Sequence, residues 1–94
     1  MIVYIAGPMT GIKNYNHEAF AMESQKQEIF GNIVLSPHRL PIGLSYDAYM
    51  DIAMAKLRSA DSVHMLPGWK QSKGATFERH YAKLLNKPIT GASE

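Results

Sequence analysis

Short apolar runs alternate with helical patterns along the chain, and this alternation restricts the possible folds more than any other feature of the sequence. Three apolar runs rich in β-forming residues predict buried strands, at residues 1–6, 33–35 and 62–66, and residues 89–90 can add a short fourth. Helical patterns separate these runs, at residues 16–30, 46–59 and 75–86. The alternation predicts an α/β fold, a small doubly wound (Rossmann-like or flavodoxin-like) parallel sheet of about four strands flanked by helices.

The three helical patterns differ in strength. Over residues 46–59 one face carries most of the apolar side chains, namely Tyr46, Tyr49, Met50, Ala53, Met54 and Leu57. The last helix is predicted to begin at Ala75 and to bury Phe77, Tyr81, Leu84 and Leu85. The first pattern, with Asn16 as its candidate N-cap and Gly31 after its end, has a thin apolar face and is expected at the edge of the core.

Length and composition indicate one ordinary globular domain over residues 1–94. So short a domain leaves its pocket open, and we therefore expect a homo-oligomer. No apolar run is long enough to cross a membrane and the N-terminus lacks the basic region of a signal peptide, which indicates a cytoplasmic protein. The chain has no cysteine and its four histidines lack metal-binding spacing, so we expect no metal and no cofactor.

The net charge of +2 is unevenly distributed along the chain. Residues 66–88 contain five basic residues against one acidic residue, which gives +4 and leaves −2 for the remainder. A positive field of this kind suits a phosphate-bearing small molecule, although the cations of the last helix equally form a solvated face. Basic and aromatic residues are too few to predict nucleic-acid binding.

Ligands of parallel α/β sheets bind beyond the carboxyl ends of the strands. The loops that follow the three main strands, residues 7–16, 37–45 and 67–74, are therefore expected to meet around one site. The first loop contains Gly7 and Gly11, which permit close backbone approach, but it matches neither GxGxxG nor a Walker motif.

The third of these loops carries the strongest signal for ligand binding. Ser72, Lys73 and Gly74 can present a hydroxyl, a positive charge and backbone amides to a phosphate, but they equally suit a polar turn. Trp69 can stack on a base, and the alternative is that it packs on its own domain.

Glu78 and Tyr4 are the candidate catalytic residues. Glu78 is expected in the first turn of its helix, where free amides favour the ionised carboxylate, a nucleophile for an anomeric carbon. An ordinary glutamate at a helix start is the alternative interpretation. Tyr4 lies within an apolar strand, and its hydroxyl either reaches towards the carboxyl end of that strand or belongs to a core tyrosine.

Three segments together resemble the nucleoside 2-deoxyribosyltransferase-like superfamily and its short, largely uncharacterised branch. The segments are YIAGPMTG at 4–11, the strand that follows Asp61, and LPGWKQSKGATFE at 66–78. The resemblance spans nearly the whole chain. It implies a doubly wound α/β fold and cleavage, by hydrolysis or transfer, of the N-glycosidic bond of a 2′-deoxynucleoside or its 5′-monophosphate.

By this resemblance Glu78 matches the nucleophilic glutamate, and Tyr4 matches the tyrosine that orients it. Ser72 resembles the phosphate-contacting serine of the 2′-deoxynucleoside 5′-phosphate N-hydrolases, which favours a nucleotide over a free nucleoside as substrate. The other residues expected to contact the substrate are Gly7, Pro8, Met9, Asn16, Trp69, Lys73 and Gly74.

The chain departs from the family at the second carboxylate. Ala53 stands eight residues before Asp61, where the family carries that acid. Asp51, Asp47 or a partner subunit can supply the missing acid, although Asp51 faces about 200° away around the helix. Without an acid, a general acid contribution of about 10²- to 10⁴-fold is lost, and the alternative function is a catalytically weak or inactive nucleotide-binding module. A third hypothesis, an interaction protein that uses Trp69 and the basic helix, has less support.

Overall fold

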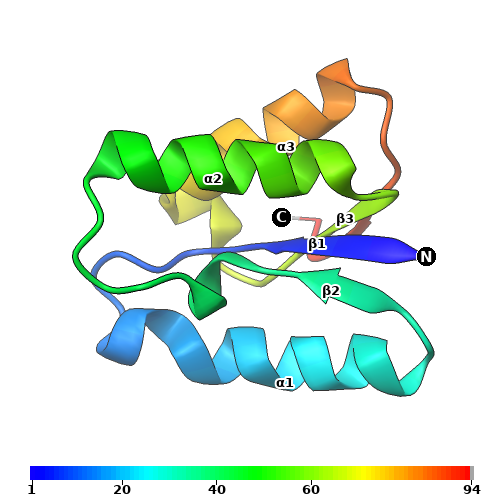
Figure 1. Ribbon diagram of the computed structural model, residues 1–94, viewed down its shortest axis with the longest axis horizontal. Helices are drawn as coiled ribbons and strands as arrows, with labels where there is room; N and C mark the ends of the chain where they lie inside the picture. Colours follow the sequence, from blue (N-terminus) through cyan, green and yellow to red (C-terminus); the bar gives the residue numbers. More distant parts are fainter. Residues whose placement is uncertain (94) are drawn as a thin grey trace.

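Four parallel strands form one sheet in the computed structural model of the protein, which describes residues 1–93 (Figure 1). The strands are β1 (Ile2–Ala6), β2 (Ile33–Leu35), β3 (Ser62–Met65) and β4 (Ile89–Gly91). Their order is β2-β1-β3-β4, and Val3 of the central β1 lies opposite both Val34 and Ser62. This sheet confirms the predicted α/β fold class, including the short fourth strand.

Helices cover both faces of the sheet (Figure 1). The helices α2 (Tyr46–Ser59) and α3 (Lys73–Leu84) lie on one face, and α1 (His17–Ile29) lies on the other. Short 3-10 helices stand in the loops, namely η1 (Lys13–Asn16), η2 (Pro37–Arg39) and η3 (Trp69–Gln71). Within residues 1–93, none of the helices is both long enough and apolar enough to cross a membrane.

The core has two parts, one on each face of the sheet. Under α2 and α3, Tyr4 packs with Leu57 and Val63. Under α1, Ile5 packs with Phe20 among others. Successive side chains of a strand point to opposite faces, so the neighbours Tyr4 and Ile5 enter different halves of the core. Tyr4 is thereby directed to the side on which α3 lies.

The buried face of α3 differs from the predicted stripe. Its buried residues are Ala75, Glu78 and Ala82, whereas Phe77 and Leu84 are exposed. The prediction was wrong for Phe77, Leu84 and Leu85, whereas Tyr81 is partly buried and packs against the core as predicted. Small alanines allow the helix to approach the sheet closely, and a carboxyl group can lie inside because the sheet supplies a hydrogen-bond donor. Apolar periodicity detects neither of these conditions.

Phe20→Ala should lower the free energy of unfolding by about 3–5 kcal/mol, because Phe20 is fully buried between α1 and the sheet. Phe30 follows the end of the same helix and is 73% exposed, so Phe30→Ala should change the free energy by less than about 0.5 kcal/mol. Urea denaturation of the two variants measures both values. Equal losses would contradict the placement of α1 on the sheet.

Candidate active site

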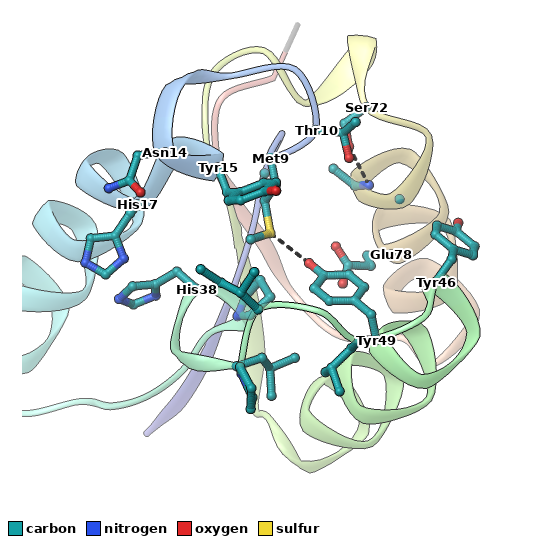
Figure 2. Close-up of a pocket in the computed structure, with 18 of the residues that line it drawn as sticks. Met9, Thr10, Asn14, Tyr15, His17, His38, Tyr46, Tyr49, Ser72 and Glu78 are labelled. Carbon is teal, nitrogen blue, oxygen red and sulfur yellow. Dashed lines mark hydrogen bonds between the residues drawn. The ribbon is translucent and has the colours of Figure 1, made fainter.

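The loops at the carboxyl ends of β1, β2 and β3 surround one cavity of about 500 Å³ (Figure 2). Residues within the segments 7–17, 37–46 and 72–75 supply most of its wall, and Tyr49 and Glu78 complete it. The chain leaves β1 towards α1 on one face and leaves β3 towards α3 on the other, so a crevice opens between these adjacent strands. The volume suits a small molecule.

Glu78 is the buried carboxyl group of this cavity. Its residue is only 2% exposed, and it lies in the second turn of α3, because the helix begins at Lys73 rather than at the predicted Ala75. The expected stabilisation of the carboxylate by the free amides of a first turn is therefore wrong. Burial instead raises the pKa of the Glu78 carboxyl to about 7, and the hydrogen bond from Tyr4 opposes this rise.

The Tyr4 hydroxyl donates a hydrogen bond to Oε2 of Glu78. Tyr4 is fully buried in β1, and its burial together with the adjacent carboxylate raises its pKa well above the usual range. The phenol therefore remains a neutral hydrogen-bond donor at every ordinary pH. This contact joins the centre of the sheet to α3 and fixes the orientation of the carboxyl group that lines the cavity.

A second tyrosine, Tyr49 of α2, lies beside Glu78 in the cavity wall (Figure 2). Its hydroxyl donates a hydrogen bond to Sδ of Met9 at 2.8 Å. Burial, and then the charge of Glu78, raises the pKa of Tyr49 above its usual range, so this phenol is also neutral. The sequence pattern had placed Tyr49 in the core stripe of its helix, without a part in the site.

No second carboxyl group lines the cavity among residues 1–93. Ala53 is fully buried one helical turn after Tyr49 and packs in the same cluster as Tyr4. Asp47 and Asp51 are exposed on α2 and lie outside the cavity wall, so the structure brings neither of these predicted substitute acids to Glu78. The described residues also contain no group of three side chains able to hold a metal ion.

The residues of the first loop that were predicted to contact the substrate lie in two places, the cavity and a neighbouring groove. Gly7 and Met9 line the cavity, whereas Pro8 and Asn16 line the groove. A Cβ atom at Gly7 would lie 2.8 Å from Cβ of Leu66, so the ends of β1 and β3 can pack closely only with glycine there. Asn16 stands at the predicted N-cap position of α1, but its side chain makes no capping hydrogen bond, and its Nδ2 donates to the carbonyl oxygen of Pro8 at 2.9 Å instead.

We call this neighbouring depression the side groove; its wall includes Pro8, Asn16, Gln71, Ser72, Lys73 and Gly74. Ser72 and Gly74 line both the cavity and the side groove, and Lys73 lines the side groove only. Oγ of Ser72 accepts a hydrogen bond from the amide of Ala75 at 3.1 Å, which makes Ser72 the N-cap of α3. The side groove therefore meets the cavity at the start of α3.

Trp69 lies outside both depressions. The residue is 5% exposed, and its Nε1 donates to the carbonyl oxygen of Ala92 at 2.9 Å. The guanidinium of Arg79 lies 4.7 Å from the centre of its ring. The structure therefore does not bring Trp69 to the predicted substrate site, because the indole packs on its own domain and binds the segment that follows β4. The hypothesis of an interaction protein loses its exposed aromatic anchor for the same reason.

His38 lines the cavity from the loop at residues 37–45, which the sequence placed at the site without naming His38 as a substrate contact. It lies in η2, its ring stacks on Phe20 with centroids 5.8 Å apart, and its Nδ1 is 2.6 Å from Oγ of Ser36. Burial, assisted by neighbouring positive charges, lowers the pKa of His38 to about 4, so the imidazole is neutral at pH 7. The sequence feature that could have indicated this role is the position of His38 directly after Ser36-Pro37, where β2 ends and a loop begins.

Residues 1–91 match the family described as "Domain of unknown function (DUF4406)". The chain belongs to the DUF4406 family. No curated protein matches the sequence of this DUF4406 domain significantly.

Among solved structures, the DUF4406 domain is similar to a 2-deoxyribosyltransferase from the psychrotolerant bacterium Bacillus psychrosaccharolyticus, described as a biocatalyst for the synthesis of nucleosides. The TM-score is 0.76 at 16% sequence identity, and the likeness covers 97% of this chain and 71% of the other. Similarity at this level of identity establishes a common fold. It agrees with the α/β fold that the sequence resemblance implied.

Glu78→Gln should stabilise the fold above pH 7. Folding raises the pKa of Glu78, so the protonated carboxyl contributes stability in acid that is lost as the pH rises through about 7. Glutamine is neutral and can still accept the Tyr4 hydrogen bond, while Tyr4 and Tyr49, the titratable groups facing it, stay neutral. Thermal unfolding should give similar Tm values for both proteins at pH 5 and a higher Tm for the variant at pH 8.5. A variant that is less stable at both pH values would contradict the buried position of the carboxyl group.

Proposed function

We propose that this DUF4406 protein cleaves the N-glycosidic bond of a 2′-deoxynucleoside or its 5′-monophosphate, by hydrolysis or by transfer, with Glu78 as nucleophile. One observation carries the proposal: a buried carboxyl group, held by a buried tyrosine, lines a cavity at the carboxyl edge of the sheet. The common fold with a 2-deoxyribosyltransferase supports the same class of reaction.

In the proposed reaction a carboxylate oxygen of Glu78 attacks C1′ of the sugar. The bond between C1′ and the base nitrogen breaks, its electron pair leaves with the base, and a glycosyl ester remains on Glu78. Water or a second base then attacks C1′ and releases the carboxylate. The hydrogen bond from Tyr4 holds the carboxyl in one orientation, which reduces the freedom that must be lost on the way to the transition state.

The far wall of the cavity suits the base. His38 lies across the cavity from Glu78 in Figure 2, and a neutral imidazole can donate or accept a hydrogen bond at the edge of a base. The ring of Tyr15 also lines the cavity and replaces Trp69 as a candidate stacking partner. With the sugar at Glu78, the base extends towards η2.

The side groove suits the 5′-phosphate. It contains the start of α3, where backbone amides favour an anion, and the positive charge of Lys73. Oγ of Ser72 accepts a hydrogen bond from within α3, so its own hydrogen can point to a phosphate oxygen. Ser72 and Gly74 belong to both depressions, so a nucleotide can place its sugar in the cavity and its phosphate in the side groove.

Ala53 favours one second candidate function, a nucleotide-binding module with little or no turnover. In the described part of the chain, no carboxyl group other than Glu78 lines the cavity, so none is available there to protonate a leaving base. Calorimetry that detects a bound nucleotide without conversion, together with cleavage restored by Ala53→Asp, would support this alternative. Failure to bind any nucleoside or nucleotide would exclude it.

We also propose that the protein works as a homo-oligomer. The outer face of α3 leaves Phe77, Leu84 and Leu85 exposed, and an association of subunits would remove this apolar surface from water. Light scattering should report a mass above that of one chain. A monomer at micromolar concentration would contradict the oligomer.

Glu78→Gln should reduce release of free base from a mixture of deoxynucleosides and deoxynucleotides by at least about 10³-fold, because the nucleophile is lost. Glu18→Gln is the matched control, since Glu18 is exposed at the start of α1. Mass spectrometry of the mixture after incubation with each protein identifies the base and the sugar product. Base release by the wild type that persists in Glu78→Gln would contradict the proposed role of Glu78.

Ser72→Asp separates the phosphate contact of Ser72 from its structural role. Aspartate caps a helix as well as serine does, so the Tm should change little. Its charge should repel a 5′-phosphate, and the preference for a monophosphate over the free nucleoside, as a ratio of kcat/KM values, should fall at least about tenfold. An unchanged ratio would place the phosphate elsewhere.

A further inference from the structure

We propose that the substrate of this site carries a positively charged base, such as a pyridinium or an N-alkylated purine, which departs as a neutral molecule without receiving a proton. The inference rests on the proposed function of Glu78 and narrows its substrate class. Two independent features of the cavity support it. Its described wall has no suitable acid to protonate a leaving base, and it contains one acidic side chain but no lysine or arginine.

The first feature is the lack of a suitable acid. Apart from Glu78, the titratable groups that line the cavity within residues 1–93 are three phenols and two imidazoles, those of Tyr15, Tyr46, Tyr49, His17 and His38. Phenols are weak acids near pH 7. The His38 ring is neutral and faces Ser36, and His17 stands beside His38, on the opposite side of the cavity from Glu78 (Figure 2).

The helix α2 does not supply an acid either, because Ala53 stands at the position where the resembled family carries its second carboxylate. Ala53 is fully buried in the same cluster as Tyr4, and the exposed carboxylates of α2 do not line the cavity. A neutral nucleoside releases its base as an anion unless an acid protonates it, and that help is commonly worth about 10²- to 10⁴-fold in rate. A cationic base needs no such help.

The second feature is the charge of the cavity wall. Among the described residues that line it there is no lysine and no arginine, and Glu78 is its one acidic group. Lys73, the nearest cation of the third loop, faces the side groove instead. Tyr15, Tyr46 and Tyr49 also line the cavity, and aromatic faces attract cations within about 6 Å. A cavity of this kind is complementary to a cationic ligand.

The reaction balances without an added proton donor. The carboxylate of Glu78 forms a bond to C1′, and the bond from C1′ to the ring nitrogen breaks. Its electron pair stays on that nitrogen and cancels the positive charge of the ring. The carboxylate and the cation thus become a neutral ester and a neutral base. Water then attacks C1′, restores the carboxylate and releases one proton to solvent.

The cation also favours the reactive form of the nucleophile. Glu78 is protonated in part at neutral pH because it is buried, and a positive charge placed beside a carboxyl group stabilises its ionised form. A cationic substrate therefore deprotonates its own nucleophile on binding, whereas a neutral nucleoside does not. This difference adds to the advantage that the leaving group provides.

Matched pairs of substrates test the inference with the wild-type protein. Nicotinamide riboside is compared with its uncharged dihydro form, and 7-methylguanosine with guanosine, each in ribose and 2′-deoxyribose forms and with and without a 5′-phosphate. Chromatography of the released base gives kcat/KM.

We expect the charged member of at least one pair to be cleaved at least about 100-fold faster. Cleavage of the uncharged members within tenfold of the charged ones would overturn the inference and leave the proposed function intact. If no member of any pair releases base, both the inference and the proposed function are contradicted.

Tyr15 provides the test within the protein. Its ring is exposed at the cavity, so substitution there should not disturb the core. Tyr15→Leu should raise KM for the cationic substrate about threefold or more, whereas Tyr15→Phe, which keeps an aromatic face, should leave it within twofold. Equal effects of leucine and phenylalanine would contradict a cation-binding wall.

Discussion

The hydrogen bond from Tyr4 to Glu78 keeps a carboxyl group inside a domain of 94 residues, and both the packing of α3 and the site depend on it. Glu78 occupies the inner face of α3 between Ala75 and Ala82, where an apolar side chain would normally lie. Burial of a carboxyl group without a partner is costly, and Tyr4 supplies that partner from the middle of the sheet. The residue that the proposed chemistry requires is therefore also part of the core.

In the proposed function, the separation of charges assigns the base and the phosphate to different depressions. The cavity contains Glu78 and aromatic rings, whereas Lys73 and the start of α3 belong to the side groove. A sugar at Glu78 can thus direct its base towards His38 and its phosphate towards Ser72. Among residues 1–93 the cavity wall contains neither a second carboxyl group nor a lysine or arginine, and we attribute both absences to one cause, a substrate that brings its own positive charge.

The fold was predictable from the sequence because it depends on local periodicity. The bounds predicted for α2 agree with the structure, and the short fourth strand was found from Ile89 and Thr90. The inner face of α3 was not predictable from periodicity, since it depends on a partner 74 positions away in β1, and only the family resemblance paired Tyr4 with Glu78. For a similar reason the sequence did not decide which loop side chains point inward, because other segments decide it, here Ala92 for Trp69 and the ring of Phe20 for His38.

A covalent trap tests the central claim most directly. A nucleoside whose sugar carries fluorine at C2′ forms the glycosyl ester but releases it slowly, because the fluorine destabilises the positively charged transition state. Peptide mapping of the protein after incubation with such a nucleoside, bearing either a cationic or a neutral base, should find the added sugar on Glu78. A sugar attached to any other residue, or release of the base with no adduct and no dependence on Glu78, would contradict the account.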